Sequence, residues 1–82
     1  MEPALKPDAK AVLTTRERQC LEGLAVGCSN NDIAKHLQIS VPTVALHLSN
    51  ARRKLDAKTR EHAVALAVAH GLISPKFPSD PS

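Results

Sequence analysis

Hydrophobic residues recur at helical spacing along the central part of the chain, between residues 13 and 73. Intervals of three and four residues separate the apolar positions in four successive segments, and no segment alternates strictly between apolar and polar residues. A spacing of three to four places side chains on one face of a helix, whereas strands have a period of two. The pattern therefore predicts an all-α fold, a bundle of four helices without strands.

Capping residues indicate where each predicted helix begins. The expected N-caps are Thr14, Ser29, Ser40 and Thr59. An acidic residue follows each of the first two caps after three positions, Glu17 in one case and Asp32 in the other. This spacing is typical of a capping box, in which two side chains satisfy free backbone N–H groups at the helix start.

The predicted helix ends carry residues that suit a left-handed backbone. Gly27 can end the first helix, and Gly71 can end the fourth, with Leu72 placed for the hydrophobic contact of a C-cap. The third helix is expected to run to about Leu55, where Asp56 tolerates a left-handed conformation better than most residues.

The second and third predicted helices have the proportions of a helix-turn-helix. A helix of barely two turns, a connection at residues 38–40 and a longer helix follow one another. The apolar face of the longer helix is formed by Val44, Leu48, Ala51 and Leu55. The major groove of B-DNA is wide enough for one helix, so this arrangement suits DNA binding, although other small helical bundles share it.

Composition narrows the kinds of partner. The 82 residues carry a net charge of +3, which permits a polyanionic partner without requiring one. Phe77 is the only aromatic residue, whereas modules for single-stranded nucleic acid usually stack bases on aromatic rings. Two prolines in residues 1–12 and three in residues 74–82 predict a linker or disordered leader and a disordered tail.

Candidate chemistry for an enzyme or a metal site is missing from the sequence. Two cysteines, Cys20 and Cys28, are too few for a disulfide framework or a zinc site and are expected to be reduced. The histidines outside the third helix are interpreted as surface residues; they are His36, His62 and His70. No nucleophile–base arrangement, cofactor motif or apolar stretch of about 20 residues occurs, so we expect no enzymatic activity, no cofactor and no membrane span.

Several stretches at fixed separations resemble one known family. They are "LTTRE" at 13–17, "LAVGCSNNDIAKHLQIS" at 24–40, "TVALHLSNARRKL" at 43–55 and "REHAVALAVAHGLI" at 60–73. Residues 13–73 thereby closely resemble the DNA-binding domain of the LuxR family of bacterial transcription regulators, also called GerE-like. The runs "NARRKLDA" and "GLI" are most similar to its quorum-sensing, autoinducer-responsive branch. Gln38 departs from the usual glycine of the turn, and Leu46 from the phenylalanine frequent in that branch.

The resemblance implies a tetrahelical domain and assigns roles to its exposed residues. The residues expected to read bases are Ala45, Leu46 and Ser49. The alternative is that these positions are ordinary surface, where small residues are merely tolerated. Contacts to the DNA backbone are expected from Asn30, Asn31, Ser40, Thr43, His47, Asn50, Arg53 and Lys54. Arg52 and Arg60 are either further contacts or solvated charges. The fourth helix commonly dimerises in this family, which points to Val64 and Val68; additional core is the alternative.

The expected function is sequence-specific binding of double-stranded DNA by a cytoplasmic, nucleoid-associated bacterial regulator acting as a homodimer. The chain would be either the output domain of a longer transcription regulator or a single-domain regulator. RNA polymerase is a further candidate partner. The competing hypothesis is a protein-interaction module that dimerises with a full-length LuxR-type regulator and titrates it.

Overall fold

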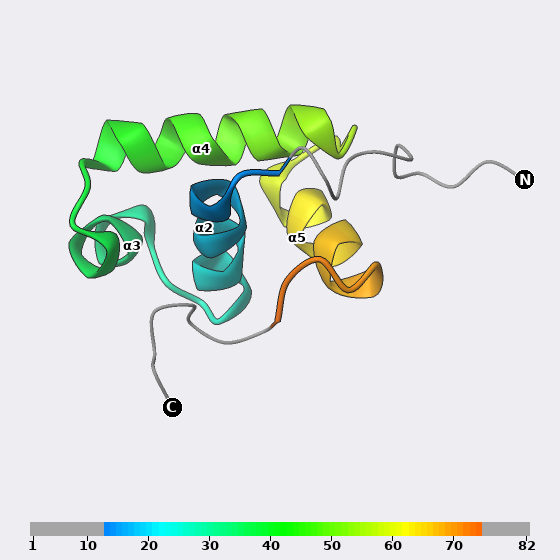
Figure 1. The fold of residues 1–82 in the computed structure, drawn as a ribbon, viewed down its shortest axis with the longest axis horizontal. Helices are drawn as coiled ribbons and strands as arrows, with labels where there is room; N and C mark the ends of the chain where they lie inside the picture. The colour runs from blue at the N-terminus through cyan, green and yellow to red at the C-terminus, as the bar shows by residue number, and fades with distance from the viewer. Residues whose placement is uncertain (1–12, 75–82) are drawn as a thin grey trace, which may run out of the picture.

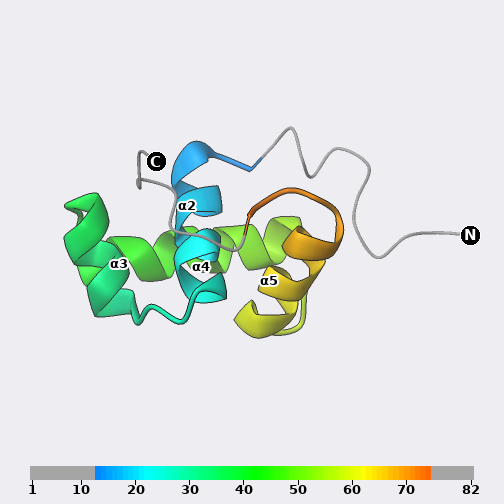
Figure 2. The same ribbon diagram turned by 90° about the horizontal axis from the view of Figure 1, so that it is seen from below.

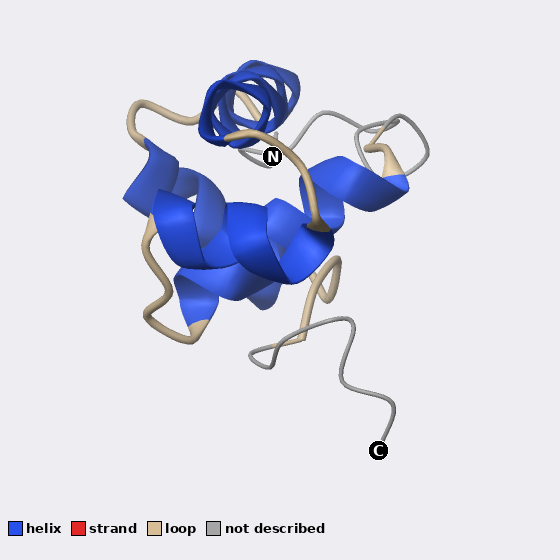
Figure 3. Ribbon diagram, turned by 90° about the vertical axis from the view of Figure 1, so that its left-hand side faces the viewer, coloured by secondary structure: helices blue, strands red, loops and turns tan. Residues whose placement is uncertain are grey.

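The computed structural model describes residues 13–74, which form four α-helices and no strand (Figure 1). The helices are α2 (Thr15–Ala25), α3 (Asn30–Leu37), α4 (Val41–Lys54) and α5 (Arg60–Ala69). Figure 3 shows the same region as helices joined by loops alone. The predicted all-α, four-helix fold is confirmed. The predicted leader and all of the predicted tail except Ser74 lie outside the described residues.

Every helix begins at the N-cap that the sequence predicts. The caps Thr14, Ser29, Ser40 and Thr59 each accept a hydrogen bond from the backbone N–H three residues later. The Thr14 hydroxyl accepts from the Glu17 N–H at 3.1 Å, and the Glu17 carboxylate accepts from the Thr14 N–H at 3.0 Å. Ser29 and Asp32 exchange the equivalent pair of bonds, both at 3.1 Å. Both predicted capping boxes are therefore present.

Within residues 13–74, four residues adopt a positive φ, and all lie just beyond helix ends. They are Gly27, Gln38, Asp56 and Gly71. The sequence predicts the two glycines and the aspartate in this role. Gln38 is different, because its φ of 59° and ψ of 45° place a residue with a Cβ in the left-handed region as the C-cap of α3.

Two helices, α2 and α4, each pack against all three of the other helices. The helix α4 is the longest of the four. It lies across one side of the molecule, with α2, α3 and α5 on the other side, as Figures 1 and 2 show from two directions. The largest fully buried side chains are Leu21, Ile33, Leu55, Val44 and Cys20. They come from α2, α3 and the α4 region, so the core fixes the orientation of α4 relative to α2 and α3.

The described residues hold no group of three or more His, Cys, Asp or Glu side chains suited to a metal ion. Burial raises the pKa of the Cys20 thiol to about 11, so this thiol stays protonated near neutral pH. Among residues 13–74, no helix is both long and apolar enough to cross a membrane.

Candidate DNA interface

The three predicted base-reading residues lie on one exposed face of α4. Ala45, Leu46 and Ser49 are all exposed, and Leu46 is 57% exposed. The opposite face of the helix is buried, with Val44 fully enclosed and Leu48 4% exposed. Since the buried face fixes the rotation of α4, the row of small and apolar side chains has to face outward.

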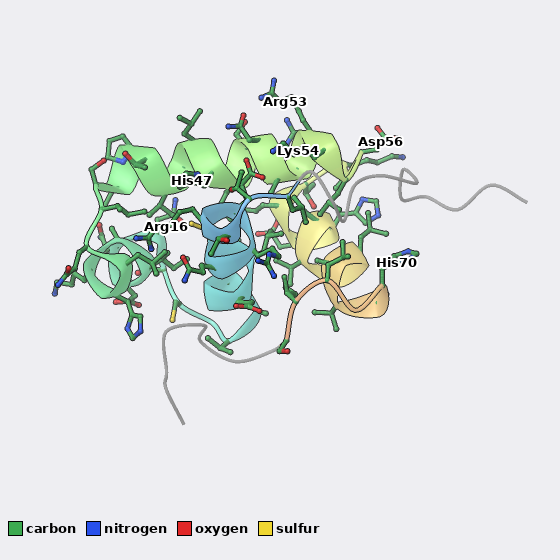
Figure 4. All side chains as sticks on the ribbon, viewed as in Figure 1. Arg16, His47, Arg53, Lys54, Asp56 and His70 are labelled. Atoms are coloured by element: carbon green, nitrogen blue, oxygen red, sulfur yellow. The ribbon has the colours of Figure 1, made fainter. Side chains whose placement is uncertain are left out.

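Lys and Arg side chains are confined to the far end of this helix. The segment 41–51 contains no Lys, Arg, Asp or Glu, whereas Arg52, Arg53 and Lys54 close the helix. In Figure 4, Arg53 projects outward from α4, away from the other helices. Its guanidinium donates a hydrogen bond to the Asn50 amide oxygen, so two predicted backbone contacts are linked to one another.

One flank of α4 is tied to α2 by an ion pair. The Lys54 ammonium donates to both carboxylate oxygens of Glu17, at 2.8 and 3.1 Å. The Glu17 side chain is almost fully buried, with 4% of its surface exposed. Lys54 therefore has a structural role at this flank, and its contact with DNA stays a prediction.

The electrostatic environment of Glu17 favours its ionised form. Burial acts first and raises its pKa, because the charged carboxylate loses solvation. Hydrogen bonds from Lys54 and from the Thr14 backbone, together with the positive charges of Lys54 and His47, lower the pKa by more. The net result is a pKa below the ordinary value of 4.5. His47 therefore lies on the flank of α4 that faces Glu17.

The other flank of α4 borders a surface cavity of about 320 Å³. Its walls come from the start of α3, the middle of α4 and the start of α5. The lining residues are Asn30, Ala45, Leu48, Ser49, Arg52, Lys58, Thr59 and Arg60. Ala45 and Ser49 therefore belong both to the exposed face of α4 and to the cavity wall. Sequence reasoning left Arg52 and Arg60 as either solvated charges or contacts and did not single out Lys58.

The remaining predicted backbone contacts lie at helix starts and on the flank near α2. The hydroxyls of Ser40 and Thr43 share one hydrogen bond of 2.7 Å at the start of α4, in which either hydroxyl can be the donor. Asn31 is exposed, and Asn30 accepts a hydrogen bond from Arg60 at 3.2 Å. Thr43, His47 and Asn50 are all partly buried. Their contacts with DNA stay predictions.

The histidines outside α4 are not alike in exposure. His36 and His70 are exposed, whereas His62 is partly buried and its Nδ1 accepts a hydrogen bond from the Lys58 N–H at 3.1 Å. His62 therefore helps to close the loop before α5 in addition to lying near the surface.

The two valines predicted at a dimer interface also differ in exposure. Val64 is partly buried and packs against the hydrophobic core, whereas Val68 is 41% exposed. A second surface cavity, of about 220 Å³, lies between α2 and α5 and is lined by Leu24, Ala25, Arg60, Glu61 and Val64. Of the two valines, Val68 alone is largely free to meet another molecule.

Comparison with known proteins decides the family. The sequence profile of the bacterial regulatory proteins of the luxR family matches residues 11–67, more than half of the chain. The chain belongs to the LuxR family. The predicted resemblance is confirmed, and α3 and α4 form the DNA-binding helix-turn-helix of this LuxR-family domain.

Relatives of this LuxR-family chain include a transcriptional activator and two solved structures. The transcriptional activator SolR of Ralstonia solanacearum is 44% identical over 71 residues, which are 87% of this chain and 30% of SolR. The structure of the transcription factor GerE matches with a TM-score of 0.74 and 36% identity, over 78% of this chain and 96% of that one. The Vibrio cholerae VqmA dimer, a LuxR-type receptor, matches with a TM-score of 0.70 and 32% identity, over 78% of this chain and 30% of VqmA.

The fraction of each relative's length that this chain matches differs among the three. The chain spans about a third of the length of SolR and of VqmA. In contrast, the match takes in nearly all of the GerE chain.

Proposed function

We propose that this LuxR-family chain binds double-stranded DNA with sequence preference and thereby regulates transcription in a bacterium. The observation that carries the proposal is the exposed row of Ala45, Leu46 and Ser49 on α4, opposite the buried Val44 and Leu48. This row carries no charged side chain, and all three of its residues are exposed on the surface of α4. A helix presented in this way fits the major groove.

The side chains in this row favour particular base edges. Ala45 and Leu46 suit apolar contact with the methyl group of thymine, and the Ser49 hydroxyl bonds to a donor or an acceptor on a base. None of the three can form the bidentate contact that arginine makes with guanine. We therefore expect the contacted positions of the preferred site to favour A·T pairs.

Contacts with phosphates would orient α4 without reading sequence. The expected contacts are Asn31, Ser40, Thr43, His47, Asn50, Arg53 and Lys54, to which sequence reasoning also adds Asn30. The positions 43, 47, 50 and 54 form one row along the helix, at spacings of four, three and four residues. They lie on the flank of α4 near α2. One strand of the duplex would run along this flank.

A homodimer is the proposed active form. One small module buries a limited interface with DNA, and a symmetric dimer doubles it on a palindromic site. Support comes from the exposed Val68 on α5 and from the solved relative VqmA, which is described as a dimer. We place the protein with the nucleoid in the bacterial cytoplasm, either as the output part of a longer regulator or acting alone. The similarity to SolR and the quorum-sensing resemblance fit the first arrangement.

A gel-shift titration tests this function. The 82-residue chain is added to a labelled duplex from the region upstream of its own gene, with an excess of unlabelled duplex of scrambled sequence. We expect a shifted band that survives the scrambled competitor and weakens as salt rises, because binding releases counterions. Loss of the band to an equal amount of scrambled competitor would contradict sequence preference.

The same titration distinguishes DNA binding from the competing hypothesis of a protein-interaction module. Val68 could instead dock on α5 of a full-length LuxR-type regulator, as an interaction module would. In that case the chain alone would shift no duplex, and adding it would remove the shifted band of the full-length regulator. A band formed by the chain alone at moderate salt argues against titration as its function.

A further inference from the structure

Three cations from two separate segments converge on the cavity beside α4. Arg52 comes from the last turn of α4, and Lys58 and Arg60 come from the start of α5. Asn30, Ser49 and Thr59 add an amide and two hydroxyls to the walls, and the lining contains no acidic side chain. A cavity with this lining favours an anion with several acceptor oxygens.

Both guanidinium groups are held in place by neighbours and keep donors free for a ligand. Arg60 Nη1 donates to the Asn30 side-chain oxygen at 3.2 Å, and Arg60 Nε pairs with the exposed Glu61 at 3.4 Å. Arg52 Nη1 donates to the Ala57 backbone carbonyl at 3.2 Å. A guanidinium has five N–H donors, so Arg60 retains three beyond these bonds and Arg52 retains four.

The helix termini add to the positive potential of the cavity. Asn30 is the first residue of α3 and Arg60 is the first residue of α5. The N-terminus of a helix carries a partial positive charge, so both dipoles reinforce the three side-chain charges. Lys58 makes no side-chain hydrogen bond or ion pair within residues 13–74 that would neutralise its ammonium.

We propose that this cavity binds a phosphate group of the DNA backbone, with Arg52, Lys58 and Arg60 as its ligands and Asn30 as the residue that positions Arg60. The inference deepens the proposed function and rests on it. It adds three cations to the expected contacts and changes the role of Asn30, which holds a ligand side chain instead of meeting the phosphate directly.

The position of the cavity selects a DNA phosphate over a free anion. Ala45, Ser49 and Arg52 form a row along α4 at spacings of four and three residues, on the side opposite the row that contains Thr43 and His47. A major groove is bordered by one strand on each side. With α4 in the groove, the row containing Thr43 meets one strand, and the cavity meets the other.

Salt dependence of binding gives the first test. The affinity of the full chain for its preferred duplex is measured across a salt series for the parent, Arg60→Gln, Lys58→Gln and Arg18→Gln. Arg18→Gln removes the same charge from an exposed site on α2 that does not line the cavity. We expect each cavity variant to bind the duplex with about tenfold lower affinity than the parent. The slope of log affinity against log salt should be shallower by about 0.9 for each cavity variant. Arg18→Gln should match the parent in both affinity and slope.

Neutralisation of single phosphates gives the decisive test. Each phosphate of the duplex is replaced in turn by an uncharged methylphosphonate. We expect one phosphate position per half-site at which replacement weakens binding by the parent protein. At the same position, replacement should not weaken binding by Arg60→Gln or Lys58→Gln any further, because each variant has already lost the contact. Circular dichroism checks that each variant is folded, and Lys58→Gln keeps the test valid if Arg60→Gln loosens the start of α5.

The outcomes separate this inference from the proposed function. In one outcome the parent prefers its site, but every methylphosphonate weakens the cavity variants by the same factor as it weakens the parent. The proposal of a phosphate site is then wrong, and the proposed DNA binding stands. If the parent binds no duplex preferentially, the proposed function fails first. If inorganic phosphate alone causes saturable amide shifts at Asn30, Ser49 and Thr59 while no DNA phosphate couples to the cavity, the site binds a small anion and the inference is overturned.

Discussion

Gln38 carries the clearest backbone strain among the described residues. Its φ of 59° lies in the left-handed region, where a Cβ approaches the following carbonyl group. Asp56 has a similar φ of 58°, but its short polar side chain is better tolerated there. The turn between α3 and α4 therefore contains a local cost of about 1 kcal/mol that glycine would avoid.

Gln38→Gly is expected to stabilise the domain. The left-handed conformation at the α3 C-cap is preserved without the Cβ, so the free energy of unfolding should rise by about 1 kcal/mol. Urea denaturation followed by circular dichroism measures the change. The matched control is Gln38→Ala, which keeps the Cβ and gains nothing. A glycine variant no more stable than the alanine variant would show that the turn is unstrained.

Local signals explain why the helix boundaries were predictable from sequence. An N-cap side chain and the backbone N–H that donates to it lie three residues apart, so Thr14 with Glu17 and Ser29 with Asp32 can be recognised in a short window. The second role of Glu17 was not predictable. Its partner Lys54 is 37 residues away, and their contact depends on how α2 packs across α4.

At the scale of the elements, the Glu17–Lys54 pair fixes α2 to the interface helix. The pKa of Glu17 is lower in the folded protein than its ordinary value of 4.5. The pair therefore contributes its full stability above about pH 4.5, and this contribution is lost as pH falls through the lowered pKa of the folded state.

Glu17→Gln isolates the charge from the capping interaction. The glutamine oxygen still accepts from the Thr14 N–H, but the attraction to Lys54 is lost, so we expect a decrease in unfolding free energy of about 1–2 kcal/mol at pH 7. Denaturant titrations from pH 7 to pH 3 should show the difference between variant and parent shrinking as pH falls.

Glu61→Gln is the control for this prediction. It removes a carboxylate that is 78% exposed and pairs with the exposed Arg60. Exposed pairs of this kind contribute about 0.5 kcal/mol or less. A constant difference between Glu17→Gln and the parent over the whole pH range would contradict the lowered pKa of Glu17.

At the scale of the whole molecule, the surface of α5 bears on self-association. Sequence spacing grouped Val64 with Val68, but packing against the hydrophobic core covers Val64 in part and leaves Val68 41% exposed. The sequence likewise could not place Arg52, Lys58 and Arg60 around one cavity with Asn30, because three helices must meet to form it. Helical faces follow from spacing along one helix, whereas these arrangements follow from packing between helices.

Val68→Asp is expected to weaken dimerisation about tenfold or more, because a carboxylate would lose solvation at the interface. Sedimentation velocity over a concentration series measures association, and circular dichroism should stay helical. Val26→Asp is a matched control, since Val26 is 42% exposed and lies outside α5. Equal association by Val68→Asp and the parent would remove α5 from the proposed interface.

Val64→Asp should also lower the stability of the fold, since Val64 packs partly against the core.

The central claim is that the uncharged face of α4 reads base edges, and Ala45→Arg tests it most directly. The parent and the variant are each used to select binding sites from a pool of randomised duplexes. Position 45 is exposed, so the longer side chain can be accommodated without disturbing the core, and its guanidinium can reach O6 and N7 of guanine. The account predicts that the variant gains a preference for guanine at one symmetric pair of positions, with discrimination of about 1–3 kcal/mol, while the other positions are unchanged. Selection of the same sequence by both proteins would contradict the account.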